Sequence, residues 1–274
     1  MNHGAPQGPY AADLALALDI ADAVDALTLA GSHGEIEVEV KPDDTPVTAI
    51  DRGAEHLVRQ MLTAARPADA IQGEEYGLTG DAARRWVVDP IDGTKNFVRG
   101  VPVWATLIGL VDRDAAGRDV AVVGVVSAPA LGRRWYAAVG DGAWSVTRLT
   151  GTDPSPRRLR VSATADLSQA YLSIASVGGW VEQGREHHIT ALQSAVGRVR
   201  GFGDFWSYML VAEGAIDLAT EPELSLHDMA ALAPIVTEAG GTFTSLTGQD
   251  GPFGGNALAS NGLLHTAALA VIAP

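Results

Sequence analysis

Two aspartates, Asp89 and Asp92, lie three positions apart at the end of the apolar run Trp86–Val88. Pro90 separates them and Gly93-Thr94 follows at once, so the stretch predicts a buried strand that ends in a tight polar turn. Carboxylates this close repel each other unless a cation lies between them. The alternative is a surface turn, Asp-Pro followed by Asp-Gly, and the stretch alone leaves both interpretations open.

Two further acidic positions could complete a cation site. Glu74 follows a short predicted strand within Gly-Glu-Glu, and neighbouring strands could bring it to Asp89. Its alternative is a solvated charge pair with Glu75 on a loop. Asp228 begins a predicted helix, where a carboxylate complements the helix dipole, so a plain helix cap is the alternative there. Together the four carboxylates predict an all-oxygen site, which suits Mg²⁺ or Mn²⁺ and not Zn²⁺.

Such a site indicates phosphate ester hydrolysis, in which an aspartate shared by two ions is the usual arrangement. One ion activates water and the other stabilises the leaving oxygen. Thr94 and Asp51 are candidates for orienting that water, because a threonine hydroxyl can accept a proton and pass one to a carboxylate. The sequence has no GxGxxG after a strand, no P-loop, no GxSxG and no cysteine, so the chemistries that need these motifs lack support.

Composition limits the partners. The chain has 274 residues, a hydrophobic fraction of 47% and a formal net charge of -14. The apolar content is ample for a core, and the negative charge argues against binding to nucleic acid or to an anionic membrane. No Lys or Arg precedes the first apolar run, and aspartates interrupt that run, so neither a secretory signal nor a membrane span is expected. We therefore expect a soluble, cytoplasmic protein.

The periodicity of the N-terminal half predicts the elements that position these residues. An amphipathic helix is expected over 11–29 and an alternating strand over 35–41. Thr48 and Asp51 form the pattern of a capping box at the start of the next helix. A short strand then ends in a polar loop over 73–85. Further strands are expected at 104–111, 120–127, 134–139 and 143–146.

The stretch 147–160 is interpreted as a linker between an N-terminal half, residues 1–150, and a C-terminal half, residues 151–274. Its three arginines are expected to form a solvated strand face rather than a phosphate site. The second half alternates strands with helices. Strands are expected near 170–175, 199–202, 216–219, 242–245 and 257–260. Helices are expected at about 184–196, 204–214, 227–239 and 263–272, with Pro234 predicting a kink or a late start in the third.

Three motifs, in this order, resemble the inositol monophosphatase superfamily. They are Gly73-Glu74-Glu75, the stretch Trp86–Phe97, and Glu221 with Asp228-Met-Ala-Ala running to Gly240-Gly241. The resemblance covers nearly the whole chain. It implies an α/β (α+β) fold, a layered αβαβα sandwich of the inositol monophosphatase and fructose bisphosphatase type. It also implies a homodimeric phosphomonoesterase that depends on two or three Mg²⁺ ions, for which Mn²⁺ could substitute.

The resemblance assigns roles by motif match. The ligands of one ion would be Glu74, Asp89 and the backbone carbonyl of Ile91, and those of a second would be Asp89, Asp92 and Asp228. Gly93 and Thr94 would bind the phosphate at a helix N-terminus. Thr94 and Asp51 would activate the attacking water, and Glu74 would help to position it. The family usually has Trp before its last metal aspartate, where this chain has His227. We expect this histidine at the surface, and the alternative is a side chain that supports the metal ligands.

Substrate choice depends on other positions. Glu221 stands seven positions before Asp228, where inositol phosphatases of this family bind sugar hydroxyls. The turn Arg200–Asp204 matches the family's pocket turn, which is usually small and uncharged where this chain has Asp204. Two carboxylates favour a cationic substrate over an uncharged polyol. A helix N-cap is the alternative for Asp204, and Asn96 is a third candidate for substrate binding.

The stretches 95–105 and 219–223 resemble the histidinol phosphatases that actinobacteria have within this superfamily. The implied reaction is hydrolysis of a small-molecule phosphate ester, L-histidinol phosphate, to L-histidinol and phosphate in histidine biosynthesis. The first alternative is an inositol-1-phosphate phosphatase of broad specificity. A nucleotide 3'-phosphatase would want an extra basic cluster, which is not seen near the motifs. A catalytically silent metal-binding protein is the remaining alternative, although all four carboxylates are present.

Overall fold

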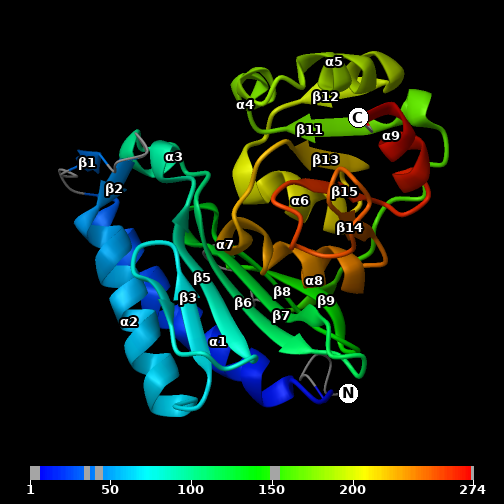
Figure 1. Cartoon of the computed structure of the whole chain (residues 1–274). Helices are drawn as coiled ribbons and strands as arrows, with labels where there is room; N and C mark the ends of the chain where they lie inside the picture. The colour runs from blue at the N-terminus through cyan, green and yellow to red at the C-terminus, as the bar shows by residue number, and fades with distance from the viewer. Residues whose placement is uncertain (1–6, 34–37, 41–45, 149–154, 273–274) are drawn as a thin grey trace.

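The computed structural model describes residues 7–33, 38–40, 46–148 and 155–272. Within these residues, layers alternate as helix, sheet, helix, sheet and helix (Figure 1). The predicted layered αβαβα fold is therefore confirmed. Among the helices in these ranges, none is long and apolar enough to cross a lipid bilayer.

The larger sheet contains eight strands. In spatial order they are β10 (Arg157–Arg158), β9 (Gly142–Thr147), β8 (Arg133–Ala138), β7 (Asp119–Ala128), β6 (Ala105–Arg113), β5 (Arg85–Asp92), β3 (Ala70–Gly73) and β4 (Gly77–Thr79). β3 and β5 are parallel, and the other neighbours are antiparallel. β5, β6 and β7 are nearly continuous apolar runs because helices cover both faces of the sheet.

The smaller sheet contains five strands. Their order is β12 (Arg198–Arg200), β11 (Tyr171–Ile174), β13 (Leu218–Glu221), β15 (Ala257–Ser260) and β14 (Thr242–Thr244). The first three strands in this order are parallel to one another, and the last two pair antiparallel. A separate two-stranded ribbon pairs β1 (Val38–Val40) with β2 (Pro46–Thr48). Of the strand predicted over 35–41, residues 38–40 are β1 and the others lie outside the described residues.

Helices cover the sheets in three layers (Figure 1). The outer face of the larger sheet carries α1 (Ala11–Gly31) and α2 (Ala49–Ala65). Between the sheets lie α6 (Asp204–Ala212), α7 (Leu226–Met229) and α8 (Leu232–Glu238). Over the smaller sheet lie α4 (Val177–Glu182), α5 (Glu186–Ala195) and α9 (His265–Ile272). The remaining helices are α3 (Thr94–Val98) and two 3-10 turns, η1 (Pro129–Leu131) and η2 (Leu167–Gln169).

Several boundaries differ from the sequence-based expectations. The helix predicted over 227–239 is two helices, and Pro234 lies in the first turn of α8, which is the late start that the proline predicts. The loop predicted over 73–85 contains the short strand β4, and α4 was not predicted. Arg157 and Arg158 are exposed and pair with β9, so the expected solvated strand face is confirmed. The division of the chain at residue 150 stays a prediction.

Two facing glycines let the middle helices approach the larger sheet closely. Gly109 on β6 and Gly124 on β7 are direct cross-strand partners. A Cβ atom added to Gly109 would lie 2.8 Å from the carbonyl carbon of Ala230, and one added to Gly124 would lie 2.1 Å from the carbonyl oxygen of Ala231. We call this pair the glycine notch. The junction between α7 and α8 therefore rests on the backbone of the sheet, which sets the height of α7 above β5 and β6.

Charged side chains of α1 turn into the protein, contrary to the simple amphipathic pattern. Asp13 is only 5% exposed and accepts bonds from Arg66 at 2.9 Å and Arg84 at 2.6 Å. Further along the same helix, Asp25 accepts a bond from Arg134 at 2.7 Å. Asp13 is buried and Asp25 half-buried, each beside a guanidinium, which is the arrangement that makes burial of charge tolerable.

Candidate active site

A bulge at the end of β5 brings its two aspartates to one side of the strand. In a regular strand, residues three positions apart face opposite sides of the sheet. The register between β5 and β6 shifts between Asp89 and Asp92. Pro90 lies inside this irregularity, where it has no N–H to leave unpaired, and its carbonyl accepts the Thr106 hydroxyl at 2.8 Å. Both carboxylates therefore reach the same cavity.

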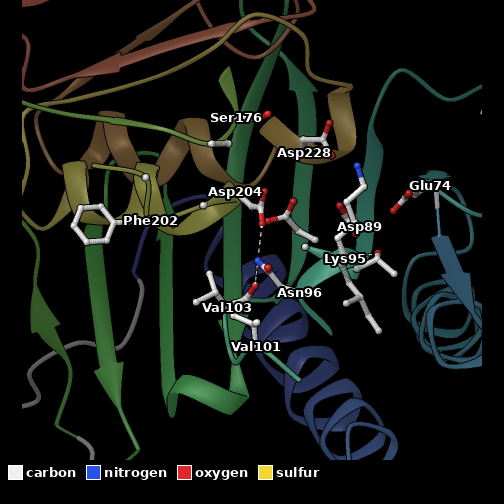
Figure 2. A pocket seen from close by; sticks show the side chains of 17 residues that line it. Glu74, Asp89, Lys95, Asn96, Val101, Val103, Ser176, Phe202, Asp204 and Asp228 are labelled. Carbon is white, nitrogen blue, oxygen red and sulfur yellow. Dashed lines mark hydrogen bonds between the residues drawn. The ribbon is translucent and has the colours of Figure 1, made fainter. Parts of the chain in front are cut away.

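That cavity has a volume of about 570 Å³ and is lined from both halves of the chain (Figure 2). Nine of the predicted site residues line it, namely Glu74, Asp89, Ile91, Asp92, Gly93, Thr94, Asn96, Asp204 and, from α7, Asp228. The predicted candidates Asp51 and Glu221 are not among the lining residues; Asp51 contacts Thr94, and Glu221 feels the charge of Asp204. Lys95 is the only basic side chain among the lining residues that the structure describes.

The carboxylates form two overlapping groups that share Asp89. Oxygen atoms of Asp89, Asp92 and Asp228 all lie within 4.8 Å of one another. Atoms of Glu74, Asp89 and His227 meet the same limit. Asp89 is thus common to both groups, which agrees with its expected place as a bridging ligand, although its role as a ligand stays a prediction.

Burial and mutual repulsion disfavour the charged form of these carboxylates unless a cation is bound. Asp89 is 2% exposed, and its Oδ1 has no hydrogen-bond partner among the described residues. Burial raises the pKa of Asp89 well above its usual range, and the Glu74 carboxylate adds to this. The pKa of Asp92 is also raised well above its usual range, by burial first and then by Asp204. A buried carboxylate oxygen without a donor, among further carboxylates, fits a divalent cation that takes oxygen ligands.

The capping box of α2 fixes the Asp51 carboxylate, which in turn contacts Thr94. The Asp51 carboxylate accepts the Thr48 N–H at 2.8 Å and the Thr48 hydroxyl at 2.5 Å. The Thr94 hydroxyl lies 3.3 Å from Asp51 Oδ1 and 2.9 Å from the Ile91 carbonyl oxygen. Burial raises the pKa of Asp51. The predicted capping box is confirmed, and it leaves the other carboxylate oxygen of Asp51, Oδ1, to bond to Thr94 at the start of α3.

Asp204 is not the N-cap of α6. It is the first helical residue, with a φ of 41°, and Gly203 occupies the N-cap position. The Phe205 N–H, a donor of the first turn of α6, instead bonds to Asp92 Oδ2 at 2.9 Å. The Asp204 side chain turns into the cavity, where it accepts a bond from Asn96 at 3.1 Å (Figure 2). A non-glycine residue with positive φ is uncommon and is held in place by its surroundings.

Asn96 and Glu221 complete the surroundings of Asp204. The Asn96 amide donates its second hydrogen to the Val103 carbonyl at 2.9 Å, so its orientation is fixed. Burial raises the pKa of Asp204, and the Asp228 carboxylate raises it further, whereas Lys95 lowers it. Burial, followed by the charge of Asp204, raises the pKa of Glu221 to about 8. The end of the cavity at Asp204 therefore also carries more acidic than basic groups.

Glu55 is a site residue that sequence reasoning missed. Its carboxylate is 0% exposed and accepts the Glu75 N–H at 2.7 Å, the Tyr76 N–H at 3.2 Å and the Arg59 side chain at 2.7 Å. A Cβ at Gly73 would lie 1.9 Å from it, so the glycine leaves room for this contact. Glu55 therefore holds the turn that presents Glu74. The signal in the sequence was a glutamate on the apolar face of a predicted helix, since a buried carboxylate there needs hydrogen-bond donors.

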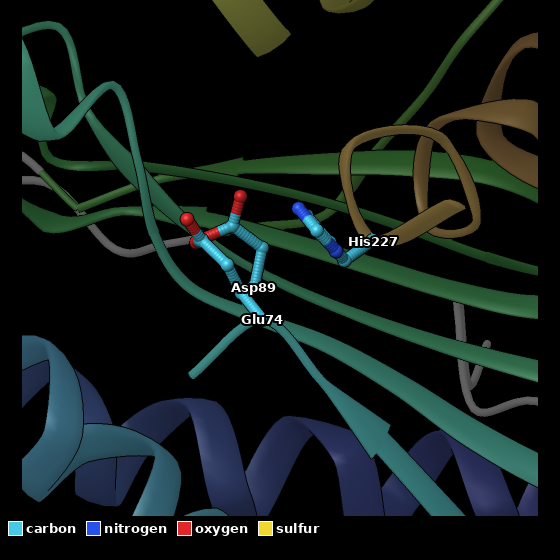
Figure 3. Close-up of side chains that lie close together, drawn as sticks. All are labelled: Glu74, Asp89 and His227. Carbon is cyan, nitrogen blue, oxygen red and sulfur yellow. The ribbon is translucent and has the colours of Figure 1, made fainter. Parts of the chain in front are cut away.

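His227 does not lie at the surface, so that expectation is wrong. Its side chain is 20% exposed, and its ring is directed at the carboxylates of Glu74 and Asp89 (Figure 3). Nε2 lies 3.6 Å from Asp228 Oδ1. The second residue of α7 points toward β5 because the glycine notch lets this helix sit low on the sheet.

Fold and site together define a layered αβαβα protein with a carboxylate site of the kind that holds divalent cations. The model of the inositol monophosphatase family matches residues 10–273. The chain is 55% identical to a histidinol-phosphatase of Streptomyces coelicolor and 52% identical to one of Mycobacterium tuberculosis, over 93% and 92% of its length and 95% of theirs. A solved IMPase of Thermotoga maritima superposes with a TM-score of 0.81 at 30% identity, covering 95% of this chain and 96% of that one. The chain belongs to the inositol monophosphatase family.

Proposed function

We propose that this protein is a Mg²⁺-dependent phosphoric monoester hydrolase that converts L-histidinol phosphate to L-histidinol and phosphate. The observation that carries the choice of substrate is the second acidic group of the cavity, Asp204 with Glu221 behind it. An ammonium group repays the desolvation of these carboxylates, which an uncharged polyol does not. The similarity to two histidinol-phosphatases over nearly their whole length supports the same choice.

The proposed metal ligands are those expected from the motifs. Glu74, Asp89 and the Ile91 carbonyl would hold one ion, and Asp89, Asp92 and Asp228 a second. When bound, divalent ions activate water and stabilise the developing charge on the phosphate and the leaving oxygen. The number of ions, two or three, and the use of Mn²⁺ belong to the same proposal.

The chain's own residues supply orientation and proton transfer. Thr94 would accept the proton of the attacking water and pass its own hydroxyl proton to Asp51, which lies 3.3 Å away. Glu74 would help to position that water. Burial raises the pKa of Asp51, which favours the uptake of that proton. Gly93 and Thr94, at the start of α3, would donate to the phosphate oxygens.

A direct assay separates the candidate functions. We expect Mg²⁺-dependent phosphate release from L-histidinol phosphate with a kcat/KM about tenfold higher than from inositol 1-phosphate, because a charge-assisted contact with Asp204 contributes roughly 1.5 kcal/mol. A preference for inositol 1-phosphate would contradict the proposed substrate and favour the broad-specificity alternative. Absence of turnover on both esters would favour a catalytically silent protein.

A second test uses Asp204 alone. Asp204→Asn keeps the acceptor for Asn96 and removes the charge, so we expect the KM for histidinol phosphate to rise about tenfold while hydrolysis of p-nitrophenyl phosphate changes little. Equal losses on both esters would show that Asp204 only supports the structure. A homodimer and a cytoplasmic location remain parts of the proposal, and sedimentation velocity tests the first of them.

A further inference from the structure

The ring of His227 completes a mixed nitrogen and oxygen donor set beside the all-oxygen one. Glu74 comes from the turn after β3, Asp89 from β5 and His227 from α7, and one ligating atom of each lies within 4.8 Å of the other two (Figure 3). Around an ion with bonds of about 2.1–2.2 Å, donor atoms lie about 3–4.4 Å apart, so a shift of a few tenths of an ångström would suffice.

Two observations separate this group from an ordinary ion pair. The buried Asp89 Oδ1 has no hydrogen-bond partner in the described structure, so one donor of the set is already desolvated and unpaired. The contact of His227 with Asp228 is 3.6 Å, which is longer than a hydrogen bond. No hydrogen bond among the described residues fixes the His227 ring in another direction.

We propose that His227 is a direct metal ligand, so that the two groups sharing Asp89 are chemically unlike sites. Imidazole nitrogen is a ligand for Mn²⁺, Co²⁺ and Zn²⁺, whereas Mg²⁺ prefers oxygen. The group Glu74, Asp89 and His227 would therefore select a transition metal, and the group Asp89, Asp92 and Asp228 would take Mg²⁺. This inference rests on the proposed metal-dependent function and adds a metal preference to it.

The test reads the metal–nitrogen bond directly. Metal-free protein is loaded with less than one equivalent of Mn²⁺, and pulsed EPR measures coupling of the electron spin to ¹⁴N. We expect a ¹⁴N coupling of a directly bound imidazole in the native chain and its loss in His227→Phe and in His227→Gln. His187→Phe, which removes an exposed histidine on α5, is the matched control and should keep the coupling.

Calorimetry gives the second readout. We expect His227→Gln to weaken Mn²⁺ binding about tenfold or more and to change Mg²⁺ binding less than about threefold. Circular dichroism identifies a variant that has not folded, and the glutamine variant keeps a polar side chain of similar reach. Absence of ¹⁴N coupling in the native chain, or its persistence in both folded variants, would overturn the proposal. Neither readout needs turnover, so a failure of the phosphatase assay is distinguishable from a failure of this inference.

Discussion

Two regions of the larger sheet bury charge in opposite ways. On the side covered by α1, Arg134 is 2% exposed and bonds to Asp25 at 2.7 Å, Asp22 at 2.8 Å and the Ser127 hydroxyl at 2.9 Å. At the end of β5, Asp89 is equally buried, but the charged groups that raise its pKa are all carboxylates. The chain is acidic in both places, but the first places a guanidinium beside its carboxylates, whereas Lys95 is the one basic side chain among the described residues that line the second.

The difference indicates which buried charges serve the fold and which serve a ligand. Burying a charge is tolerated when the chain itself supplies the counter-charge, as Arg134 does for Asp25. Burial also raises the pKa of Asp25, but there Arg134 acts against the rise, whereas at Asp89 the neighbouring carboxylates Glu74, Asp92 and Asp228 add to it. Their mutual repulsion costs stability, which a bound cation would relieve. The site at β5 is therefore a place where stability is given up for binding, which is common in enzymes.

The largest expected effect is that of Asp89→Asn. The amide keeps the shape but removes the charge that both groups share, so we expect kcat/KM to fall at least about 1,000-fold. In the metal-free protein at pH 8, the same change should raise the free energy of unfolding by about 1–2 kcal/mol, because repulsion is relieved. Phosphate release and urea unfolding measure the two effects. A variant that is both inactive and less stable would contradict this account of the cluster.

The converse change in the other region is Arg134→Met. It leaves the half-buried Asp25 without its guanidinium, so we expect a loss of about 2–4 kcal/mol in the free energy of unfolding. Mg²⁺ affinity, measured by calorimetry on protein that remains folded at low temperature, should be unchanged. The exposed pair of Arg118 with Asp114 supplies the control, since Arg118→Met should cost less than about 1 kcal/mol. Equal costs for the two arginines would remove the contrast between buried and exposed pairs.

Glu55→Gln tests a buried carboxylate that has its own arginine partner and also supports the cavity. Glu55 pairs with Arg59 but also holds the turn of Glu74, so its amide would present an NH₂ group to backbone donors. We expect Mg²⁺ affinity to fall about 10–100-fold, with kcat largely recovered at saturating Mg²⁺. Glu39→Gln, in the exposed pair with Arg52, should leave Mg²⁺ affinity unaltered. A lowered kcat at saturating Mg²⁺ would show that Glu55 does more than position Glu74.

The smallest effect is a pH dependence of metal-free stability. Burial raises the pKa of Glu221 to about 8, and the pKa values of Asp89 and Asp92 are also raised, so the folded state binds protons that the unfolded state has lost. Stability should therefore fall by about 1–2 kcal/mol as the pH rises from 6 to 8. Saturating Mg²⁺ should remove or reverse this trend. Thermal unfolding measured with EDTA checks the sign, and a melting temperature that rises toward pH 8 would contradict it.

Local patterns allowed most of this structure to be predicted. The strand through Asp89, the capping box of Thr48 and Asp51, and the late start at Pro234 each depend on neighbours within a few residues. Contacts between distant segments could not be read from such patterns. Glu55 acts on backbone groups of Glu75 and Tyr76, and the N-cap interpretation of Asp204 failed because Asp92 supplies the acceptor for α6 from another sheet.

The prediction that His227 lies at the surface was wrong for the same physical reason. Its ring faces the carboxylates because the junction of α7 and α8 packs on the backbone of β6 and β7. No motif in these two strands predicts that packing. Likewise, the burial of Asp13 depends on Arg66 and Arg84, which lie far along the chain. Sequence reasoning thus named the carboxylates that meet at the cavity, because motifs contain them, and missed Glu55, which holds the turn of Glu74, and the inward direction of His227.

The glycine notch has a consequence for how the sequence can vary. Gly109 and Gly124 are not among the described residues that line the cavity, yet any side chain there would displace the junction of α7 and α8 and move Asp228 away from Asp89. Loss-of-function mutations should therefore accumulate at two positions that have no functional group at all. A mutational scan scored on stability alone would rank them as packing defects, although their main damage would be to the spacing between the two ends of a metal site.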